Sequence, residues 1–372
     1  MTADARFVVV GGGVVAAAAA YQLARRGAAV IIVEGDQPGI ATNAGAGIIC
    51  PWTAPLEDAW YRLCSEGARH YSELLPMLAD DGQAETGYAR VGALCVADQA
   101  EMLSGMAAML RSRQATAPDM GDVTALAPGD PGQLFPLLAA TLAGFLITGA
   151  ARIDGRAIRD SLLHSAVSRG ARRVPGNASL ERSGGRVTGV RVDAERIGAD
   201  AVVVAAGAWT AQVCAGFGVQ LPVTPERGQI VHTRLPSTDT ASWPVVLADR
   251  DPYLVAFPGG RVVAGATREE ADFQYSATVA GVGGLLAGAV ALAPGLAAAE
   301  LIETRIGFRP VTSDGRPLLG AIADGLIVAT GHGAEGLTAG PWSGLAVAQL
   351  ALGEQPATDL APFSPYRFQS KE

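Results

Sequence analysis

Side chains that bind metals or form disulfides are scarce in this chain of 372 residues. The four cysteines form no C-x-x-C pair and the four histidines are dispersed; they are Cys50, Cys64, Cys95, Cys214, His70, His164, His232 and His332. None of the spacings typical of metal sites occurs among them. We therefore predict reduced, unreactive thiols and no bound metal.

A basic patch is also missing. The formal net charge is −8 and the arginines are scattered, which argues against a nucleic-acid partner. The first apolar run begins at Phe7 and leaves no room for a signal peptide before it, so we expect no export. We expect a cytoplasmic protein, either free or peripheral at the inner face of the membrane.

One long stretch, Val279–Ala299, has no charged residue and could span a bilayer. It consists mostly of alanine and glycine, and Pro294 lies near its end. We predict a buried amphipathic helix that ends at the proline, and no transmembrane segment.

The amino-terminal stretch from Phe7 to Glu34 has the pattern of a dinucleotide site. A short β-branched strand is followed by Gly11 and Gly13, which match the first two glycines of G-x-G-x-x-G/A, and Ala16 takes the third position. The helix that follows would offer free N–H groups to a pyrophosphate. Glu34 ends the second strand, where an acid binds the ribose and disfavours NADP. These residues alone leave FAD and NAD open.

The length predicts two domains. The run Ala201–Ala205 is a second buried strand ending at a small-residue turn, and Ala59–Leu78 and Ile158–Ser168 have helical periodicity. Between Val223 and Phe273 short strands alternate with Pro and Gly turns, which predicts an antiparallel sheet. The predicted fold is α/β: a Rossmann-like dinucleotide-binding domain with an inserted α+β substrate domain built on an antiparallel sheet.

Eight motifs occur along essentially the whole chain, in this order: VVVGGG with its later Glu34, TNAGAG, VVVAAGAW, PERGQ, YLVAFP, GATREE, GFRPVTSDGRPLLG and ATGHGAEGLT. This series resembles the D-amino-acid oxidase superfamily, which includes glycine and sarcosine oxidases and the D-amino-acid and D-hydroxyproline dehydrogenases. The resemblance implies FAD rather than NAD. We expect the FAD-binding domain to comprise residues 1–82, 145–222 and 300–372, and the substrate-binding domain residues 83–144 and 223–299.

Carried over position by position, the resemblance implies an FAD-binding set in four groups. The ADP half would contact Gly11, Gly13 and Glu34, together with Val14, and the adenine would lie near Ala178. The pyrophosphate and isoalloxazine would follow Thr42, Asn43, Ala44, Gly47 and Ile48, and the dinucleotide would pass Ala206, Gly207 and Trp209. Gly331, His332, Gly333, Gly336, Leu337 and Thr338 would border the pyrimidine side of the flavin, where a helix N-terminus favours the negative charge formed on reduction. For His332 a packed turn histidine is an equal alternative.

The resemblance also implies the substrate contacts. Arg309 in GFRP matches the arginine that pairs with the substrate carboxylate, a task that suits a guanidinium fork. Tyr253 matches a tyrosine that assists at the same carboxylate, and a core aromatic on a strand is an equal alternative for it. The implied reaction is oxidation of a small D-amino acid or N-substituted amino acid, with hydride transfer from Cα to flavin N5, giving an imino acid that hydrolyses.

Three features depart from relatives in this superfamily. No cysteine follows Cys214, so we expect FAD to be non-covalent. The only lysine is Lys371, whereas the sarcosine oxidases place a lysine over the flavin, and this favours a dehydrogenase slightly over an oxidase. Glycine oxidase carries a second arginine in the turn where this chain has Ala334 and Glu335, so glycine is not favoured as substrate.

Other functions stay open from the sequence. The chain could be the flavoprotein subunit of a multi-subunit amine or opine dehydrogenase, or an FAD-binding protein without amino-acid turnover. The electron acceptor could be oxygen, a quinone or a partner protein, and a homo-oligomer is compatible with the sequence. Four residues could line a side-chain pocket or belong to the core: Trp52, Tyr88, His232 and Phe257.

Overall fold

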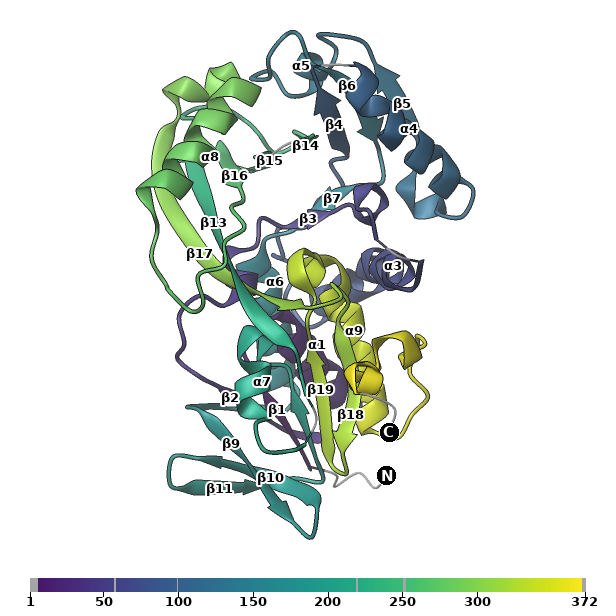
Figure 1. Ribbon diagram of the computed structural model, residues 1–372, viewed down its shortest axis with the longest axis vertical. Helices are drawn as coiled ribbons and strands as arrows, with labels where there is room; N and C mark the ends of the chain where they lie inside the picture. The colour runs from purple at the N-terminus through teal and green to yellow at the C-terminus, as the bar shows by residue number, and fades with distance from the viewer. Residues whose placement is uncertain (1–5, 57, 99, 219, 250–251, 370–372) are drawn as a thin grey trace.

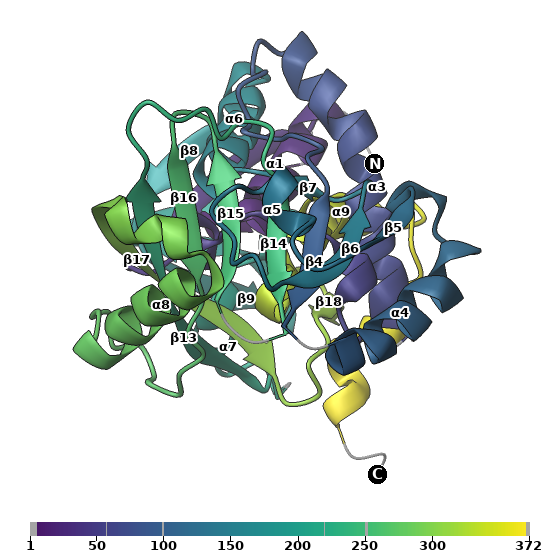
Figure 2. The ribbon, with the colours of Figure 1, turned by 90° about the horizontal axis from the view of Figure 1, so that it is seen from above.

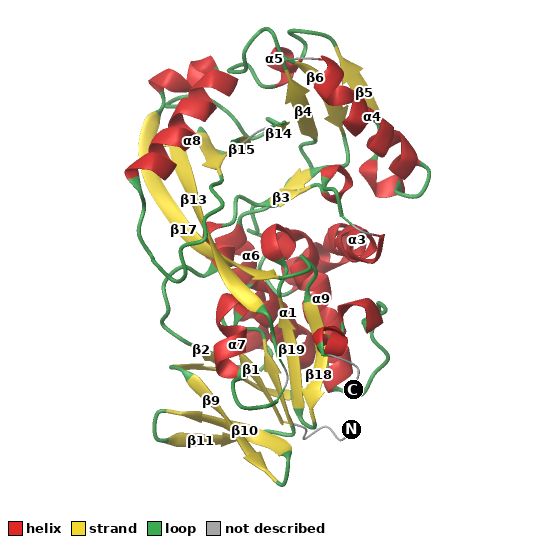
Figure 3. Cartoon of the chain, in the orientation of Figure 1, coloured by secondary structure: helices red, strands yellow, loops and turns green. Residues whose placement is uncertain are grey.

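Two β-sheets, one above the other in Figure 1, organise the chain. The computed structural model describes residues 6–369 except 57, 99, 219, 250 and 251, and within α4 the side chains of 100–102 are not described either. Lys371 therefore lies outside the described residues. Figure 3 shows that helices flank the lower sheet, whereas the upper sheet carries fewer of them.

The lower sheet contains the predicted dinucleotide-binding strands. Its order is β18-β19-β12-β1-β2-β8, and only β18 runs antiparallel to its neighbour. The strands are β1 (Arg6–Val10), β2 (Ala29–Glu34), β8 (Arg172–Pro175), β12 (Ala201–Val204), β18 (Leu318–Ala323) and β19 (Leu326–Thr330). Phe7, Val8 and Val9 are fully buried, as expected for a parallel strand covered on both faces. The predicted parallel sheet is confirmed.

Helices cover one face of this sheet, and a small sheet covers the other. The helices are α1 (Val14–Arg25), α3 (Asp58–Asp80), α6 (Gly155–Ser168) and α9 (Gly336–Ala351); the small sheet comprises β9 (Ala178–Ser183), β10 (Arg186–Val192) and β11 (Glu195–Gly198), with α7 (Thr210–Val213) beside it. A Cβ on Gly344 of α9 would lie 2.6 Å from the Ala18 Cβ of α1. The small residues of α1 therefore let α9 pack closely, and both helices begin near the carboxyl edge of the sheet.

The upper sheet has eight strands in the order β17-β13-β16-β15-β14-β4-β6-β5. They are β4 (Ala93–Ala97), β5 (Val123–Leu126), β6 (Ala143–Ile147), β13 (Val223–Arg234), β14 (Val245–Ala248), β15 (Tyr253–Phe257), β16 (Arg261–Gly265) and β17 (Glu300–Thr312). All neighbours are antiparallel except β14 and β4, which pair in parallel. The antiparallel sheet is confirmed. The limits of the two domains remain a proposal, and β17 pairs with β13 in this sheet although we assigned residues 300–372 to the FAD-binding domain.

Short elements join the two sheets. They are α2 (Ala41–Ala44), β3 (Ile48–Ile49), the 3₁₀ turn Pro51–Thr53 and β7 (Ala151–Arg152), which pairs with β3. Figure 1 shows β3 and β7 between the two sheets. The upper sheet also carries α4 (Ala100–Gln114), α5 (Pro131–Leu134) and α8 (Val279–Leu292). Figure 2 shows α8 and α4 on opposite sides of this sheet.

The charge-free stretch forms α8, which ends just before Pro294 as predicted, but it is not buried. Of its residues only Leu285 and Ala289 are buried, and Val279 is 94% exposed. The helix packs one narrow face against β13 and β16. Its other faces consist mostly of alanine and glycine, whose small side chains expose little apolar surface to solvent. None of the helices in the described ranges is long and apolar enough to cross a membrane.

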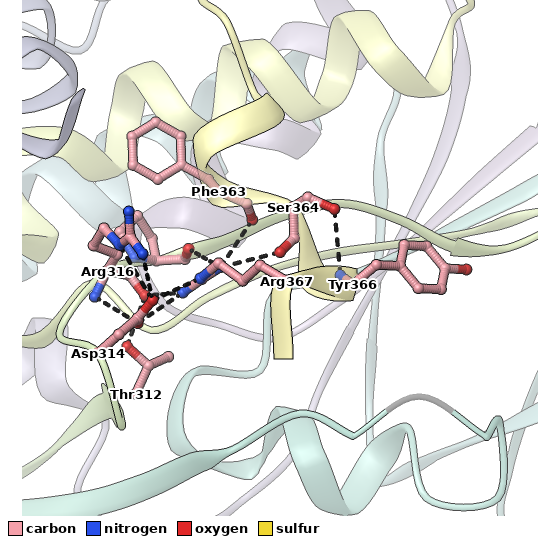
Figure 4. A network of polar contacts seen from close by, with 8 residues as sticks. Thr312, Asp314, Arg316, Phe363, Ser364, Tyr366 and Arg367 are labelled. Carbon is pink, nitrogen blue, oxygen red and sulfur yellow. Dashed lines mark hydrogen bonds and ion pairs between the residues drawn. The ribbon is translucent and has the colours of Figure 1, made fainter. Parts of the chain in front are cut away.

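The carboxyl-terminal segment holds the turn that follows β17 (Figure 4). Arg367, from the 3₁₀ turn Pro365–Phe368, pairs with Asp314 at 2.7 Å and donates to the Arg316 and Pro317 carbonyl oxygens at 2.8 and 3.0 Å. Burial acts to raise the pKa of Asp314, but the hydrogen bonds from Arg367 and the Arg316 backbone outweigh it and hold that pKa well below its usual range. These contacts hold the turn that follows β17, and the strand carries Arg309 near this end.

Candidate active site

A single continuous cavity of about 540 Å³ runs from the amino terminus of α1 to the face of the upper sheet. This volume is within the range of roughly 300–1,000 Å³ that small-molecule and cofactor sites occupy. Its walls come from the carboxyl ends of β1 and β12, from α2 and β3, from the amino-terminal turn of α9, and from β13, β15 and β17. The ligand site predicted at the carboxyl edge of the sheet and the antiparallel strands therefore share one cavity.

The end of the cavity near β1 is built for close approach to phosphate. Gly11 has a φ of +132°, and a Cβ there would lie 2.3 Å from the Ala205 carbonyl oxygen, so only glycine fits. Gly13 precedes α1 without a side-chain cap, and the Thr42 hydroxyl accepts a hydrogen bond of 3.0 Å from the Val14 N–H. Gly12, Gly13 and Val15 line the cavity beside Val14, and the first N–H groups of a helix have no acceptor within it, which suits a pyrophosphate.

Glu34 ends β2 as predicted but does not line the cavity. Its carboxylate pairs with Arg159 and lies 2.6 Å from an Arg173 nitrogen. It also packs against Gly12, where a Cβ would lie 2.2 Å from its Oε1. Binding of a ribose by Glu34 stays a prediction, and this carboxylate already has two guanidinium partners.

Most of the other predicted FAD-binding residues line the cavity. They are Gly11, Gly13, Val14, Thr42, Ala44, Gly47, Ile48, Ala178, Ala206, Gly207, Trp209, His332, Gly333, Gly336 and Leu337. Three other residues of the predicted set, Asn43, Thr338 and Gly331, are not among the residues that line the cavity. Asn43 accepts through its carbonyl from Arg156 at 3.1 Å, Thr338 donates to the Ile48 carbonyl at 3.3 Å, and Gly331, with a φ of +81°, turns the chain after β19. Trp52, Tyr88, His232 and Phe257 do not line the cavity.

His332 is packed at the start of α9, and its contact with a flavin stays a prediction. It lines the cavity, yet it is 3% exposed and its Nε2 lies 2.9 Å from the Ser343 hydroxyl of α9. Burial lowers its pKa to about 4, so the ring is neutral at physiological pH. His332 is therefore packed and uncharged beside the amino terminus of α9.

Arg309 and Tyr253 both line the other end of the cavity, on the upper sheet. The Arg309 guanidinium lies over Gly228, and its Nη1 donates to Glu226 at 2.8 Å and to the Thr267 carbonyl at 3.1 Å. Its Nη2 and Nε make no hydrogen bond within the described residues. The Arg309 side chain is 16% exposed, so this edge of a shielded guanidinium is available to a ligand. A Cβ at Gly265 would lie 2.8 Å from the Tyr253 hydroxyl, which confines the tyrosine ring.

The segment between β16 and α8 is fastened to β13 by a polar network. Arg227, which is 5% exposed, donates from Nε to Glu269 at 3.0 Å and from Nη1 to the Gln274 carbonyl at 3.1 Å. Gln229 is fully buried and donates to Glu269 at 2.6 Å and to Thr278 at 3.0 Å. This network sets the position of the Thr267 carbonyl and hence of Arg309.

Aromatic rings connect the same segment to the lower sheet. Trp209 stacks on Phe273 with centroids 5.0 Å apart, and Phe308 packs edge-on against both rings. Trp209 and Phe308 also line the cavity. The two ends of the site are thus joined by direct packing.

Sequence reasoning did not assign several polar residues of the wall: Gln37, Asn177, Gln212, Arg268 and Glu335. Arg268 belongs to the motif GATREE, and Glu335 lies in the turn that differs from glycine oxidase, but neither motif predicts that these side chains line the cavity. Arg268 faces the same Glu226 oxygen as Arg309, at 3.4 Å. Neither residue has a local pattern that marks it as cavity-facing, because each follows a strand in an irregular turn.

The predictions about cysteine and metal can be compared with the structure. All four cysteines are buried and free. Cys50 lines the cavity, but burial raises the pKa of its thiol to about 12, so it is protonated and unreactive. Among the described residues, no cluster of histidine, cysteine and carboxylate side chains has the arrangement of a metal site.

Comparison with known proteins agrees with this architecture. Residues 6–350 match the model of the DAO family, described as FAD dependent oxidoreductase. The chain is 43% identical to the uncharacterized oxidoreductase YurR of Bacillus subtilis, over 96% of this chain and 98% of that protein. The structure of iminodiacetate oxidase from Chelativorans sp. BNC1 superposes with a TM-score of 0.94 at 42% identity, covering 97% and 99% of the two chains. Glycine oxidase from Geobacillus kaustophilus gives 0.87 at 29% identity, covering 98% and 100%.

Proposed function

The chain belongs to the DAO family of FAD-dependent oxidoreductases, and we propose that it oxidises a small amino acid at the carbon next to the amine. The product would be an imino acid, which water hydrolyses to a keto acid and an amine. FAD, when bound, supplies the oxidising power by accepting the hydride. The residues at the glycine end of the cavity fit its pyrophosphate, as the Gly11 turn and the amino terminus of α1 indicate.

The observation that carries this proposal is the arrangement of Arg309. Its guanidinium is positioned by Glu226 and Thr267, and its remaining N–H edge is available at the far end of a cavity whose other end fits a dinucleotide. A fork of N–H donors in that position suits a carboxylate, which it would bind through two parallel hydrogen bonds. Tyr253 would donate to the same carboxylate. Together they would hold the donor carbon against the flavin.

Arg268 favours a substrate with a second carboxylate. Both arginines in the cavity wall face one Glu226 oxygen, so a single glutamate partners two guanidinium groups. An amino acid with one carboxylate would use Arg309 alone, whereas an N-carboxymethyl amine would use both. One structural relative is named iminodiacetate oxidase, and iminodiacetate is such a compound. We therefore include N-carboxymethyl amino acids among the substrates, beside small D-amino acids and N-methyl amino acids.

The test is anaerobic reduction of the purified flavoprotein. Iminodiacetate, sarcosine, glycine, D-proline and a panel of D-amino acids are added separately, and the visible absorbance of the oxidised flavin is followed. At least one compound should bleach it. If none does, the amine-oxidation proposal is wrong and a binding protein without turnover is the better description.

A variant of Arg309 tests the assigned carboxylate contact. Arg309→Leu should lose roughly 10²-fold or more in kcat/KM, since each of the two hydrogen bonds to the charged carboxylate is worth about 1.5–3 kcal/mol, and it should still bind FAD. Arg305→Leu, on the same strand but outside the cavity wall, is the matched control and should keep its kinetics. Unchanged kinetics in Arg309→Leu would exclude Arg309 from the site.

Admission of air after reduction tests the electron acceptor. The absence of a flavin-side lysine from the described residues favours a dehydrogenase slightly, which predicts slow reoxidation by oxygen and faster reoxidation by a quinone analogue. Reoxidation by air within seconds would assign the protein as an oxidase.

A further inference from the structure

Glu335 is the only carboxyl side chain among the described residues that line the cavity. It ends the 3₁₀ turn Gly333–Glu335 immediately before α9, and this turn packs against β17, the strand of Arg309. It is partly exposed, and it is exposed toward the cavity. A carboxyl group therefore stands on the wall between the predicted flavin edge and the predicted carboxylate site.

Side chains from four parts of the chain lie around Glu335. Cys50 follows β3, Cys64 belongs to α3, Thr338 belongs to α9, and Arg268 follows β16. Burial raises the pKa of the Glu335 carboxyl, while a hydrogen bond that it accepts from Thr338 and the Arg268 charge act in the opposite direction. The thiol pKa values of Cys50 and Cys64 are themselves raised by burial, so these neighbours are uncharged.

None of the other polar residues of the wall fits the task of a base. Arg268 and Arg309 stay protonated in proteins. The His332 Nε2 is engaged by Ser343, and burial makes its ring a poor proton acceptor by lowering its pKa to about 4. The Cys50 thiol, with a pKa of about 12, is protonated. Glu335 is thus the side chain of this wall that has the chemistry of a general base.

We propose that Glu335 accepts the proton of the substrate ammonium before the α-carbon gives up its hydride. This inference rests on the proposed function. An amino acid binds in solution mostly with a charged amine, which has no lone pair to form the C=N bond. The carboxylate would take one N–H proton and become a carboxylic acid; the neutral amine then donates its lone pair to carbon as the hydride leaves for the flavin, which is the oxidant.

The position of Glu335 in the cavity wall suits a contact with the substrate amine. With Arg309 and Tyr253 holding the carboxylate at β17 and β15, the amine, one carbon away, must lie within a few ångströms of that wall. The Gly333–Glu335 turn packs against β17, and Arg268, which faces the same Glu226 oxygen as Arg309, is also one of the charges that act on Glu335. Burial raises the pKa of Glu335, which makes its carboxylate a better proton acceptor, and the Arg268 charge acts against this by favouring the ionised form.

The experiment compares Glu335→Gln, which keeps the shape but cannot accept a proton, with the wild-type holoenzyme and with Glu335→Asp. Glu300→Gln, an exposed glutamate outside the cavity wall, is the matched control. Rates of anaerobic flavin reduction are measured from pH 6 to pH 10, about the range in which the amine titrates. Near pH 7 the rate in Glu335→Gln should fall roughly 10²- to 10⁴-fold and should rise about tenfold per pH unit as the amine loses its own proton. Glu335→Asp should recover part of the loss.

A binding measurement gives a second readout that does not depend on turnover. 2-Aminoisobutyrate has the ammonium and carboxylate groups but no hydrogen on its α-carbon, so it cannot be oxidised. Its Kd should vary little with pH around neutrality in the wild type and should tighten steadily with pH in Glu335→Gln. Equal pH dependence of Kd and of the reduction rate in both proteins, or a change in KM alone, would overturn the inference.

The two proposals fail in different ways. If no amino acid reduces the wild-type flavin, the proposed function falls and this inference falls with it. If the wild type is reduced and Glu335→Gln keeps the wild-type pH profile, only the role of Glu335 is refuted.

Discussion

Gly228→Ala is a small change that tests whether the Arg309 guanidinium must lie where the structure has it. A Cβ at position 228 would be 2.8 Å from Nη2 and 2.9 Å from both Cζ and Nη1 of Arg309. Because non-bonded heavy atoms prefer separations of roughly 3.5–4.0 Å, the guanidinium would have to move by about 0.6–1 Å. The hydrogen bonds from Nη1 to Glu226 and to the Thr267 carbonyl oppose that movement.

The expected loss follows from the geometry of a bidentate contact. A charge-assisted hydrogen bond is worth about 1.5–3 kcal/mol, so misaligning one should lower kcat/KM roughly 10- to 150-fold. Most of this should appear as a higher KM, because a carboxylate held by Arg309 contributes to binding before it contributes to orientation. FAD content should not change, since Gly228 lies at the end of the cavity away from Gly11.

Anaerobic stopped-flow reduction of the flavin measures the effect, with flavin content and thermal melting as checks on folding. Gly198→Ala is the matched control, because it also adds a methyl group in a strand but its nearest neighbour would be the Thr188 oxygen at 3.9 Å. Wild-type kcat/KM in a folded, flavin-loaded Gly228→Ala protein would refute the assignment of the Arg309 fork to the substrate carboxylate.

Two further predictions concern stability. Glu269→Gln removes the negative partner of the buried Arg227, so the free energy of unfolding should fall by roughly 1–3 kcal/mol in chemical denaturation; an unchanged value would mean that solvent already compensates Arg227. Asp314→Asn removes a carboxylate whose pKa is held low by Arg367, so its destabilisation should be full above the unfolded-state pKa of about 3.9 and should disappear as the pH falls below that value toward the folded pKa. Denaturation at pH 7 and pH 3, on either side of about 3.9, measures the difference, and equal differences at both pH values would contradict the role of Asp314.

Local patterns were sufficient for the lower sheet. The β-branched runs at Phe7–Val10 and Ala201–Ala205 predict strands buried on both faces, and both runs are buried in the fold. We predicted that α8 is buried, and this was wrong. A charge-free sequence of alanine and glycine has the same pattern in a buried helix and in an exposed one, so the pattern could not distinguish the two. Only the partner strands, β13 and β16, determine that one narrow face is covered.

Pairings between distant segments could not be predicted in the same way. β14 lies next to β4 in parallel, although about 150 residues separate them and each is surrounded by antiparallel neighbours. The alternation of side chains in a strand indicates which face is buried but not which strand lies beside it. The wall residues Arg268 and Glu335 were missed as members of the site for the same reason: their neighbours across the cavity come from other parts of the chain.

Two glycines show how such distant partners nevertheless leave a mark in the sequence. Gly12 occupies a position of the dinucleotide fingerprint that accepts any residue, and Gly228 lies in the middle of a long strand, where glycine is unfavourable. In the fold a charged side chain lies directly on each: the Glu34 carboxylate on Gly12 and the Arg309 guanidinium on Gly228. At these two positions glycine is thus required because the fold places a charged side chain against the backbone.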